Sequence, residues 1–162
     1  MARGKIEVRT KDKGWVEFFR RAREIKDKRV RVGVLSDAAH GDGETITLAE
    51  LAAVHEFGTK DGRIPERSFL RSTFDDKREE MVRAGEKLMG AVLDGKMDVD
   101  RALGLLGAKL ASDVKAKITS SIPPPDKPAT VARKGSSTTL IDTGRLRGAV
   151  TWALDDEGKG EK

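Results

Sequence analysis

The sequence contains no cysteine and only two histidines, and both shortages exclude functions. Without thiols the chain can form no disulfide, no thiolate zinc site and no cysteine nucleophile, and this composition is typical of a cytoplasmic protein. The sequence also lacks a run of about 18 apolar residues and an apolar segment at its N-terminus. We therefore expect neither a membrane span nor a signal peptide.

Aromatic residues are scarce as well. They make up 4% of the 162 residues, although 37% of the chain is hydrophobic and 36% is charged. A chain of this length suits one domain with a modest core, and we expect residues 1–162 to form one. The few aromatic side chains are then expected to anchor that core, with Leu, Val and Ala around them. They are Trp15, Phe18, Phe19, Phe57, Phe69, Phe74 and Trp152.

An apolar pattern near the N-terminus has the spacing of a helix. Trp15, Phe18, Phe19, Ala22 and Ile25 recur at intervals of three and four residues. They predict an amphipathic helix that places three of the seven aromatic side chains in the core.

The same helix carries much of the positive charge of a chain whose net charge is +5. Between residues 9 and 31, ten lysines and arginines accompany four acidic residues. Such a cluster can bind nucleic acid, and Arg20, Arg21 and Arg23 are then the residues expected to face DNA. The interspersed acids, and the lack of an aromatic platform for stacking bases, favour an ordinary solvated helix face instead.

Two segments alternate apolar and polar residues as strands do. The first is residues 29–35, where Val30 and Val32 share a face, and the second is a late segment with Val150 and Trp152 on one face. Each is short, so together they predict a small sheet.

Between the two strands, apolar residues that recur at intervals of three and four residues predict two long helices. One runs from about Glu66 to Leu93, with a stripe that includes Val82, and the other runs from Val99 to Ile118. We expect them to pack as a hairpin. The chain is therefore expected to contain both short strands and long helices.

Residues 47–71 combine a helix start, a helix stop and a stiff turn. Thr47 with Glu50 three residues later matches a capping box, and the helix that follows is expected to stop at Gly58. Pro65 then stiffens the turn before Phe69 restarts an apolar face. A loop held this firmly usually carries contacts.

His55 and Glu56 within this stretch resemble half of a zinc-protease motif. That motif needs a second histidine four residues later, where this chain has Thr59, and the other histidine, His40, lies in a Gly/Asp-rich loop. A half-buried imidazole at a helix end is the favoured interpretation of His55. We therefore expect no catalytic residue, no metal and no cofactor.

Three arginines of this stretch, Arg63, Arg67 and Arg71, are spaced four residues apart. They could bind carboxylates of a neighbouring subunit or phosphates. The alternative is a salt bridge within the chain, for example to Asp75 or Asp142.

Residues 119–139 are rich in Pro, Ser, Thr and Lys and include three consecutive prolines. They predict an extended Pro-rich loop, or polyproline arm. In the LIDTGRLRGAV segment that follows, Asp142 or Thr143 is expected to cap a helical turn that carries Leu146. Residues 155–162 are expected to form a polar tail.

Two blocks of this sequence together resemble small virion-morphogenesis proteins of tailed phages, including the phage Mu morphogenesis family. The first block ends a short helix with H-E-F-G-T and continues with I-P-x-R-x-F-L, and the second is a late L-x-D-T-G-x-L. The matching residues are His55, Glu56, Phe57, Gly58, Thr59, Ile64, Pro65, Arg67, Phe69, Leu70, Leu140, Asp142, Thr143, Gly144, Arg145 and Leu146.

The resemblance implies a structural protein that joins head and tail, as a neck or a tail-completion (terminator) ring. It also implies an α+β fold, with a small antiparallel sheet packed against long helices. It implies a homo-oligomer, a hexamer by analogy with tails, that contacts the head–tail connector and tail-tube proteins. Such a protein is assembled in the host cytoplasm and resides in the virion. The assembly interface is expected at His55, Glu56, Phe57, Gly58, Arg63, Pro65, Arg67, Phe69, Arg71, Asp142, Thr143, Gly144, Arg145 and Leu146.

Two other functions remain open at this stage. A DNA-binding module would use the basic helix within residues 14–31, and a ring around passing DNA could combine both functions. A hydrolase using His55 and Glu56 would lack a nucleophile and metal partners.

Overall fold

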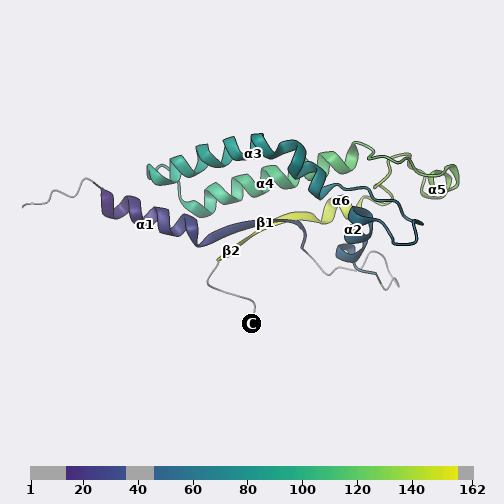
Figure 1. Ribbon diagram of the computed structural model, residues 1–162, viewed down its shortest axis with the longest axis horizontal. Helices are drawn as coiled ribbons and strands as arrows, with labels where there is room; N and C mark the ends of the chain where they lie inside the picture. Colours follow the sequence, from purple (N-terminus) through teal and green to yellow (C-terminus); the bar gives the residue numbers. More distant parts are fainter. Residues whose placement is uncertain (1–13, 36–45, 157–162) are drawn as a thin grey trace, which may run out of the picture.

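The computed structural model describes residues 14–35 and 46–156. Within these ranges six helices accompany a two-stranded antiparallel sheet, so the predicted α+β class is confirmed (Figure 1). The elements are α1 (Trp15–Lys26), β1 (Lys28–Val34), α2 (Leu48–Phe57), α3 (Leu70–Leu93), α4 (Val99–Thr119), α5 (Pro128–Lys134), α6 (Arg145–Ala149) and β2 (Val150–Asp156).

The sheet joins the beginning of the described chain to its end, because β1 pairs with β2 and Val32 lies opposite Trp152. One face of the sheet packs on α4, where Gly107 provides the space. A Cβ at Gly107 would lie 2.7 Å from Val30 Cγ2 and 3.0 Å from the Trp152 indole. Both predicted strands are present, but β2 extends through Asp156, whereas the polar tail was expected to begin at residue 155. Residues 157–162 lie outside the described range.

The predicted helical hairpin is present, and α3 and α4 lie side by side over the sheet (Figure 1). The side chain of Asp98 caps α4 by accepting a hydrogen bond from the Arg101 N–H at 2.8 Å. Helix α3 begins at Leu70 rather than near Glu66. The expected stripe on α3 is also wrong at Val82, which is 54% exposed.

Val92 of α3 is buried in one cluster with Val99, Ala102 and Leu103 of α4. The main core lies where α4, the sheet and the loop before α3 meet, and its largest fully buried side chains are Phe69, Ile118, Val114 and Val150. Helix α2 adds Ala52 to this core and begins with the predicted capping box. The Glu50 N–H donates to Thr47 Oγ1, and the Thr47 N–H donates to the Glu50 carboxylate.

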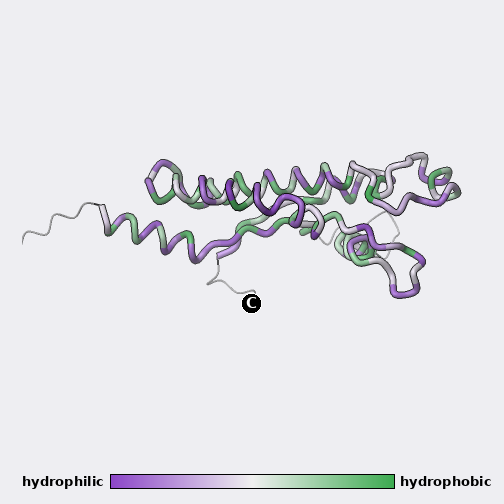
Figure 2. Tube along the Cα trace, turned by 45° about the horizontal axis from the view of Figure 1, so that its top comes forward, coloured by the Kyte–Doolittle hydropathy of each residue, from purple (hydrophilic) through white to green (hydrophobic). Residues whose placement is uncertain are grey.

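Helix α1 has the predicted extent, but the prediction that its aromatic residues lie in the core is wrong. Trp15 is 60% exposed, Phe19 56% and Phe18 37%, and no residue of α1 is buried. Their rings pack against one another instead, with centroids 5.7 to 6.1 Å apart. The helix lies at one end of the molecule, beside the loop end of the α3–α4 hairpin (Figure 2). Within residues 14–35 and 46–156, too little of the body lies at this end to cover the apolar face.

The Pro-rich loop contains a helix that its composition did not predict. Helix α5 begins with Pro128, a favourable first residue because proline has no N–H to satisfy there, and ends at Gly135 with φ of 66°. Helix α6 follows, and the expected cap at Asp142 or Thr143 is wrong. Gly144, with φ of 77°, occupies the N-cap position, and no side chain caps the helix.

Candidate functional site

The side chain of Glu56 joins the end of α2 to the beginning of α3. Glu56 is 3% exposed. Its carboxylate accepts backbone hydrogen bonds from Phe69 at 2.8 Å, Leu70 at 2.9 Å and Arg71 at 3.0 Å, and a fourth from the Ser68 hydroxyl at 2.7 Å. These backbone donors are the unpaired N–H groups of the first turn of α3. Glu56 therefore caps α3 from outside, which explains why this helix starts at Leu70.

Burial and hydrogen bonding act in opposite directions on the pKa of Glu56. Burial alone raises it, because a desolvated carboxylate is costly. The backbone N–H groups of Leu70, Arg71 and Phe69 and the Ser68 hydroxyl together outweigh burial, so the pKa lies below its ordinary value of 4.5. Glu56 is thus an ionised structural group with its acceptor positions occupied.

The turn after Glu56 is closed by its own backbone. The Thr59 N–H donates to the Ile64 carbonyl at 2.9 Å, and the Ile64 N–H donates to Thr59 Oγ1 at 3.0 Å. Gly58, with φ of 70°, lies against the segment that leaves this turn, and a Cβ there would be 2.8 Å from the Glu66 backbone nitrogen. The predicted stiff turn is present, and only glycine fits at its start.

Arg67 connects this turn to the Pro-rich loop. Its Nε donates to the Pro124 carbonyl at 2.9 Å, and its Nη2 lies 2.8 Å from Asp126 Oδ1. The other carboxylate oxygen of Asp126 lies 2.5 Å from Nζ of Lys134 on α5. All three side chains are at most 7% exposed. We call Arg67, Asp126 and Lys134 the buried clasp, because they hold the Pro-rich loop against the body.

The arginine spacing predicted contacts either with a neighbour or within the chain, and each arginine has a partner within the chain. Arg67 is in the buried clasp, Arg63 lies 3.1 Å from Asp61, and Arg71 lies 3.0 Å from Glu56 and 2.7 Å from Glu66. The partners named as examples, Asp75 and Asp142, are not the ones used. Arg71 also covers Phe57, whose ring centroid is 4.6 Å from its guanidinium carbon.

A cleft of about 640 Å³ separates the turn and α2 from the Pro-rich loop and α6. His55, Arg63, Pro65 and Arg67 of the first motif line it. From the second motif it is lined by Asp142, Thr143, Gly144, Arg145 and Leu146. The two sequence motifs, which are far apart along the chain, therefore meet at one cleft.

Five predicted interface residues do not line the cleft. Glu56 and Phe69 are buried, Gly58 shapes the turn, and Phe57 is exposed on α2 with Arg71 over its ring. His55 is half-buried at the edge of the cleft, and its carbonyl accepts the Arg67 N–H at 2.8 Å.

The basic residues of α1 are mostly engaged with the chain itself. Arg20 pairs with Glu17 and Glu24 on the same helix. Arg21 donates to the Leu93 carbonyl at 3.1 Å, at the C-terminus of α3. Arg23 is exposed. The structure therefore does not align the three arginines as one surface for DNA.

The sequence-based argument missed Asp126, Lys134 and Thr139. Thr139 is buried, and its hydroxyl donates to the Ile122 carbonyl at 3.0 Å, which closes the base of the Pro-rich loop. A lysine and an aspartate in a polar loop give no signal of burial. Only the position of Arg67 opposite them reveals their role.

In residues 14–35 and 46–156, no group of three or more His, Cys, Asp or Glu side chains is placed to hold a metal ion. The loop with His40 lies outside these ranges. No helix in the described part of the chain is long and apolar enough to cross a membrane. Comparison of the chain with protein-family models, curated proteins and solved structures gave no match.

Proposed function

We propose that this chain is a structural subunit of a tailed-phage virion that assembles with copies of itself into a neck or tail-completion ring. The proposal begins from the two motifs that resemble phage morphogenesis proteins. In the structure these motifs build a rigid turn and a cleft, with Glu56 and Arg67 as internal supports.

The observation that carries the proposal is the exposed aromatic surface of α1. We define this surface as Trp15, Val16, Phe18 and Phe19, which are exposed by 60%, 72%, 37% and 56%. Contiguous apolar side chains of this size on a protein surface mark an interaction site, and aromatic residues are enriched in such sites.

The placement of the surfaces suits a ring. Helix α1, which carries the aromatic surface, lies at one end of the long axis of the molecule, and α5, which helps to line the cleft with both motifs, lies at the other (Figure 1). A contact between two different surfaces of neighbouring copies repeats head to tail, and it closes into a ring when the rotation between copies allows. The neighbours in the particle would be the head–tail connector and the tail tube.

The test compares the mass of the purified protein with that of a W15S/F19S variant, by light scattering over a range of concentrations. We expect a discrete oligomer for the natural sequence, seen as rings by negative-stain electron microscopy. The variant is expected to weaken association at least tenfold with little change in unfolding free energy, because both side chains are exposed in the single chain.

The matched control is V82S/L105S. These apolar residues are also about half exposed, but they lie on α3 and α4 rather than on α1. A control that dissociates as much as W15S/F19S would contradict the role of the aromatic surface. Natural protein that stays monomeric alone and with connector and tail-tube proteins would overturn the proposed function.

A DNA-binding module is not our proposal. Arg20 pairs with Glu17 and Glu24, and Arg21 donates to the Leu93 carbonyl, so two of the four cations of α1 are already bound within the chain.

A further inference from the structure

The cleft between the two motifs is strongly cationic. Two carboxylates, Asp126 and Asp142, line it, and a third, Asp61, pairs with Arg63 at its edge. Six cationic side chains outnumber these acids by three. They are Arg63, Arg67, Lys127, Arg133, Lys134 and Arg145.

Two of these cations form a prepared rim. Lys127 and Arg133 are exposed; Lys127 is the N-cap residue of α5, and Arg133 lies in its last turn. The residue before Lys127 is Asp126, and the residue after Arg133 is Lys134, which are both members of the buried clasp. The clasp therefore fixes the backbone that carries both rim cations, and little backbone entropy is lost when a ligand binds them.

Much of the remaining lining is aliphatic. Leu51, Ile64 and Leu140 are among the lining residues, together with prolines 65, 124 and 125. Bare phosphate would gain nothing from these side chains. A nucleic-acid strand would need a platform of aromatic faces for successive bases, and among the lining residues in the described part of the chain there is no Phe, Tyr or Trp and a single imidazole, His55.

We propose that this cleft binds an acidic peptide segment of a partner protein, one that alternates Asp or Glu with aliphatic side chains. Its carboxylates pair with Lys127 and Arg133 at the rim, and its aliphatic side chains pack on the leucines, isoleucine and prolines below. An excess of positive charge between apolar walls also strengthens the electrostatic potential that attracts such a segment. The proposal does not depend on the ring, since the cleft lies within one chain.

The probe is a fluorescein-labelled peptide of sequence GDLEIDG, and binding is measured by fluorescence anisotropy with the full chain at low salt. Two control peptides separate the contributions: GSLSISG lacks the acids, and GDGEGDG lacks the aliphatic side chains. A labelled twelve-residue oligo-dT strand tests nucleic acid, and inorganic phosphate is added as a competitor.

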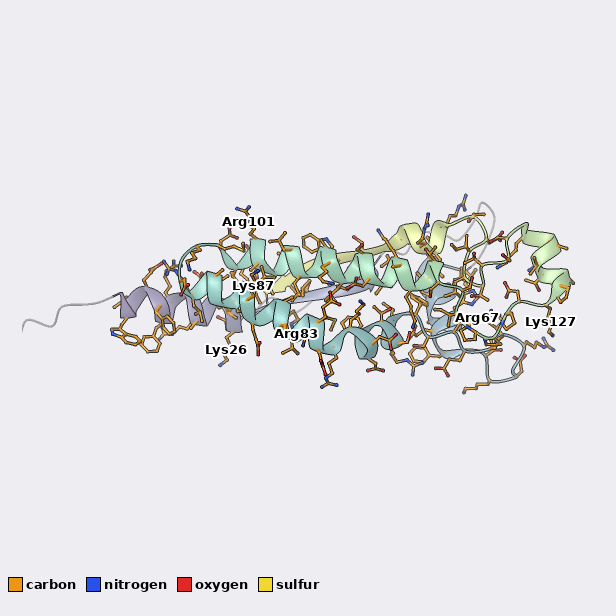
Figure 3. The ribbon with its side chains drawn as sticks, turned by 90° about the horizontal axis from the view of Figure 1, so that it is seen from above. Lys26, Arg67, Arg83, Lys87, Arg101 and Lys127 are labelled. Carbon is orange, nitrogen blue, oxygen red and sulfur yellow. The ribbon has the colours of Figure 1, made fainter. Side chains whose placement is uncertain are left out.

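The variant is K127Q/R133Q, and the matched control is K87Q/R101Q. Figure 3 shows Lys87 and Arg101 at the end of the molecule away from Lys127. All four side chains are exposed, so both variants are expected to fold, which circular dichroism checks.

We expect GDLEIDG to bind at least tenfold more tightly than either control peptide, and its affinity to fall as salt rises. K127Q/R133Q is expected to weaken binding at least tenfold and K87Q/R101Q less than twofold. The proposal is overturned if both variants behave alike, if GSLSISG or GDGEGDG binds equally well, or if oligo-dT or phosphate displaces the peptide at comparable concentration. Anisotropy is measured with both the natural chain and W15S/F19S, whose ring contact is removed, so failure here is distinguishable from failure of the ring.

Discussion

Glu56 carries the local structure of the first motif, because one buried carboxylate satisfies the first turn of a helix that begins fourteen residues later in the chain. A carboxylate at a helix N-terminus also interacts favourably with the helix dipole. The glutamate of the H-E-F-G-T motif therefore has a structural role, because its carboxylate binds the N–H groups at the start of α3.

Replacing Glu56 should therefore be costly. For Glu56→Gln we expect a loss of about 3 kcal/mol in unfolding free energy, because an amide supplies fewer acceptors to the N–H groups of Phe69, Leu70 and Arg71. Chemical denaturation followed by circular dichroism measures this loss. Glu66→Gln removes an exposed partner of Arg71 and should cost no more than about 1 kcal/mol. Equal losses in the two variants would contradict the role of Glu56.

The difference in unfolding free energy between the natural chain and Glu56→Gln should also depend on pH. The pKa of Glu56 in the folded chain lies below its ordinary value of 4.5. Its stabilisation is therefore complete above that value and is lost as the pH falls through the folded pKa. The difference in unfolding free energy between the natural chain and Glu56→Gln should be constant above about pH 6 and should narrow below 4.5. A difference that does not change down to pH 3 would be inconsistent with this assignment.

Two glycines with positive φ, Gly58 in the turn and Gly144 before α6, allow the packing of the turn to be tested by substitution. Gly58→Ala should cost about 3 kcal/mol, because its new Cβ would meet the backbone of Glu66 and Ile64 in addition to the strain of a positive φ. Gly144→Ala should cost only about 1 kcal/mol, since nothing lies within 4 Å of its Cβ position. Unfolding curves of the two variants make the comparison. Equal costs would mean that the turn shifts to accept the methyl group.

At the scale of elements, the Pro-rich loop owes its position to the buried clasp. Asp126→Asn would leave Arg67 and Lys134 buried without their counter-charge, and we expect a loss of about 3 kcal/mol or more. Limited proteolysis should then cut within residues 122–139 before it cuts the α3–α4 hairpin. Asp142→Asn, which changes an exposed acid of the same cleft, is the control and should resist proteolysis like the natural chain. A clasp variant that is as resistant would show that α5 is held by other contacts.

Elements defined by local spacing were predicted well. Val30 and Val32 lie on the face of β1 that packs against the core. The apolar residues of α4, which are three and four positions apart, lie on the face that this helix buries against the sheet. Thr47 and Glu50 are three residues apart and cap each other, so their contact is visible in the sequence.

Contacts between distant residues could not be predicted in this way. Arg67 and Asp126 are on different elements, and no spacing relates them. Amphipathic periodicity identified the apolar face of α1, but it carries no information about what covers that face. In the described part of the chain, Trp15 and Phe19 remain 60% and 56% exposed. The two motifs at the cleft were recognised as motifs, whereas their meeting is a property of the whole fold.

At the scale of the whole molecule, the pairing of β1 with β2 sets an order of events during synthesis. Val32 lies opposite Trp152, so almost all of the described chain must be made before the sheet can form. The α3–α4 hairpin uses neighbouring residues and can form earlier, while pairing of such distant strands is slow because a long loop must close. Until β2 has left the ribosome, the side of α4 that packs on Trp152 remains exposed to solvent. A nascent chain that stalls before Val150 would therefore present an apolar helix surface to chaperones or to other chains.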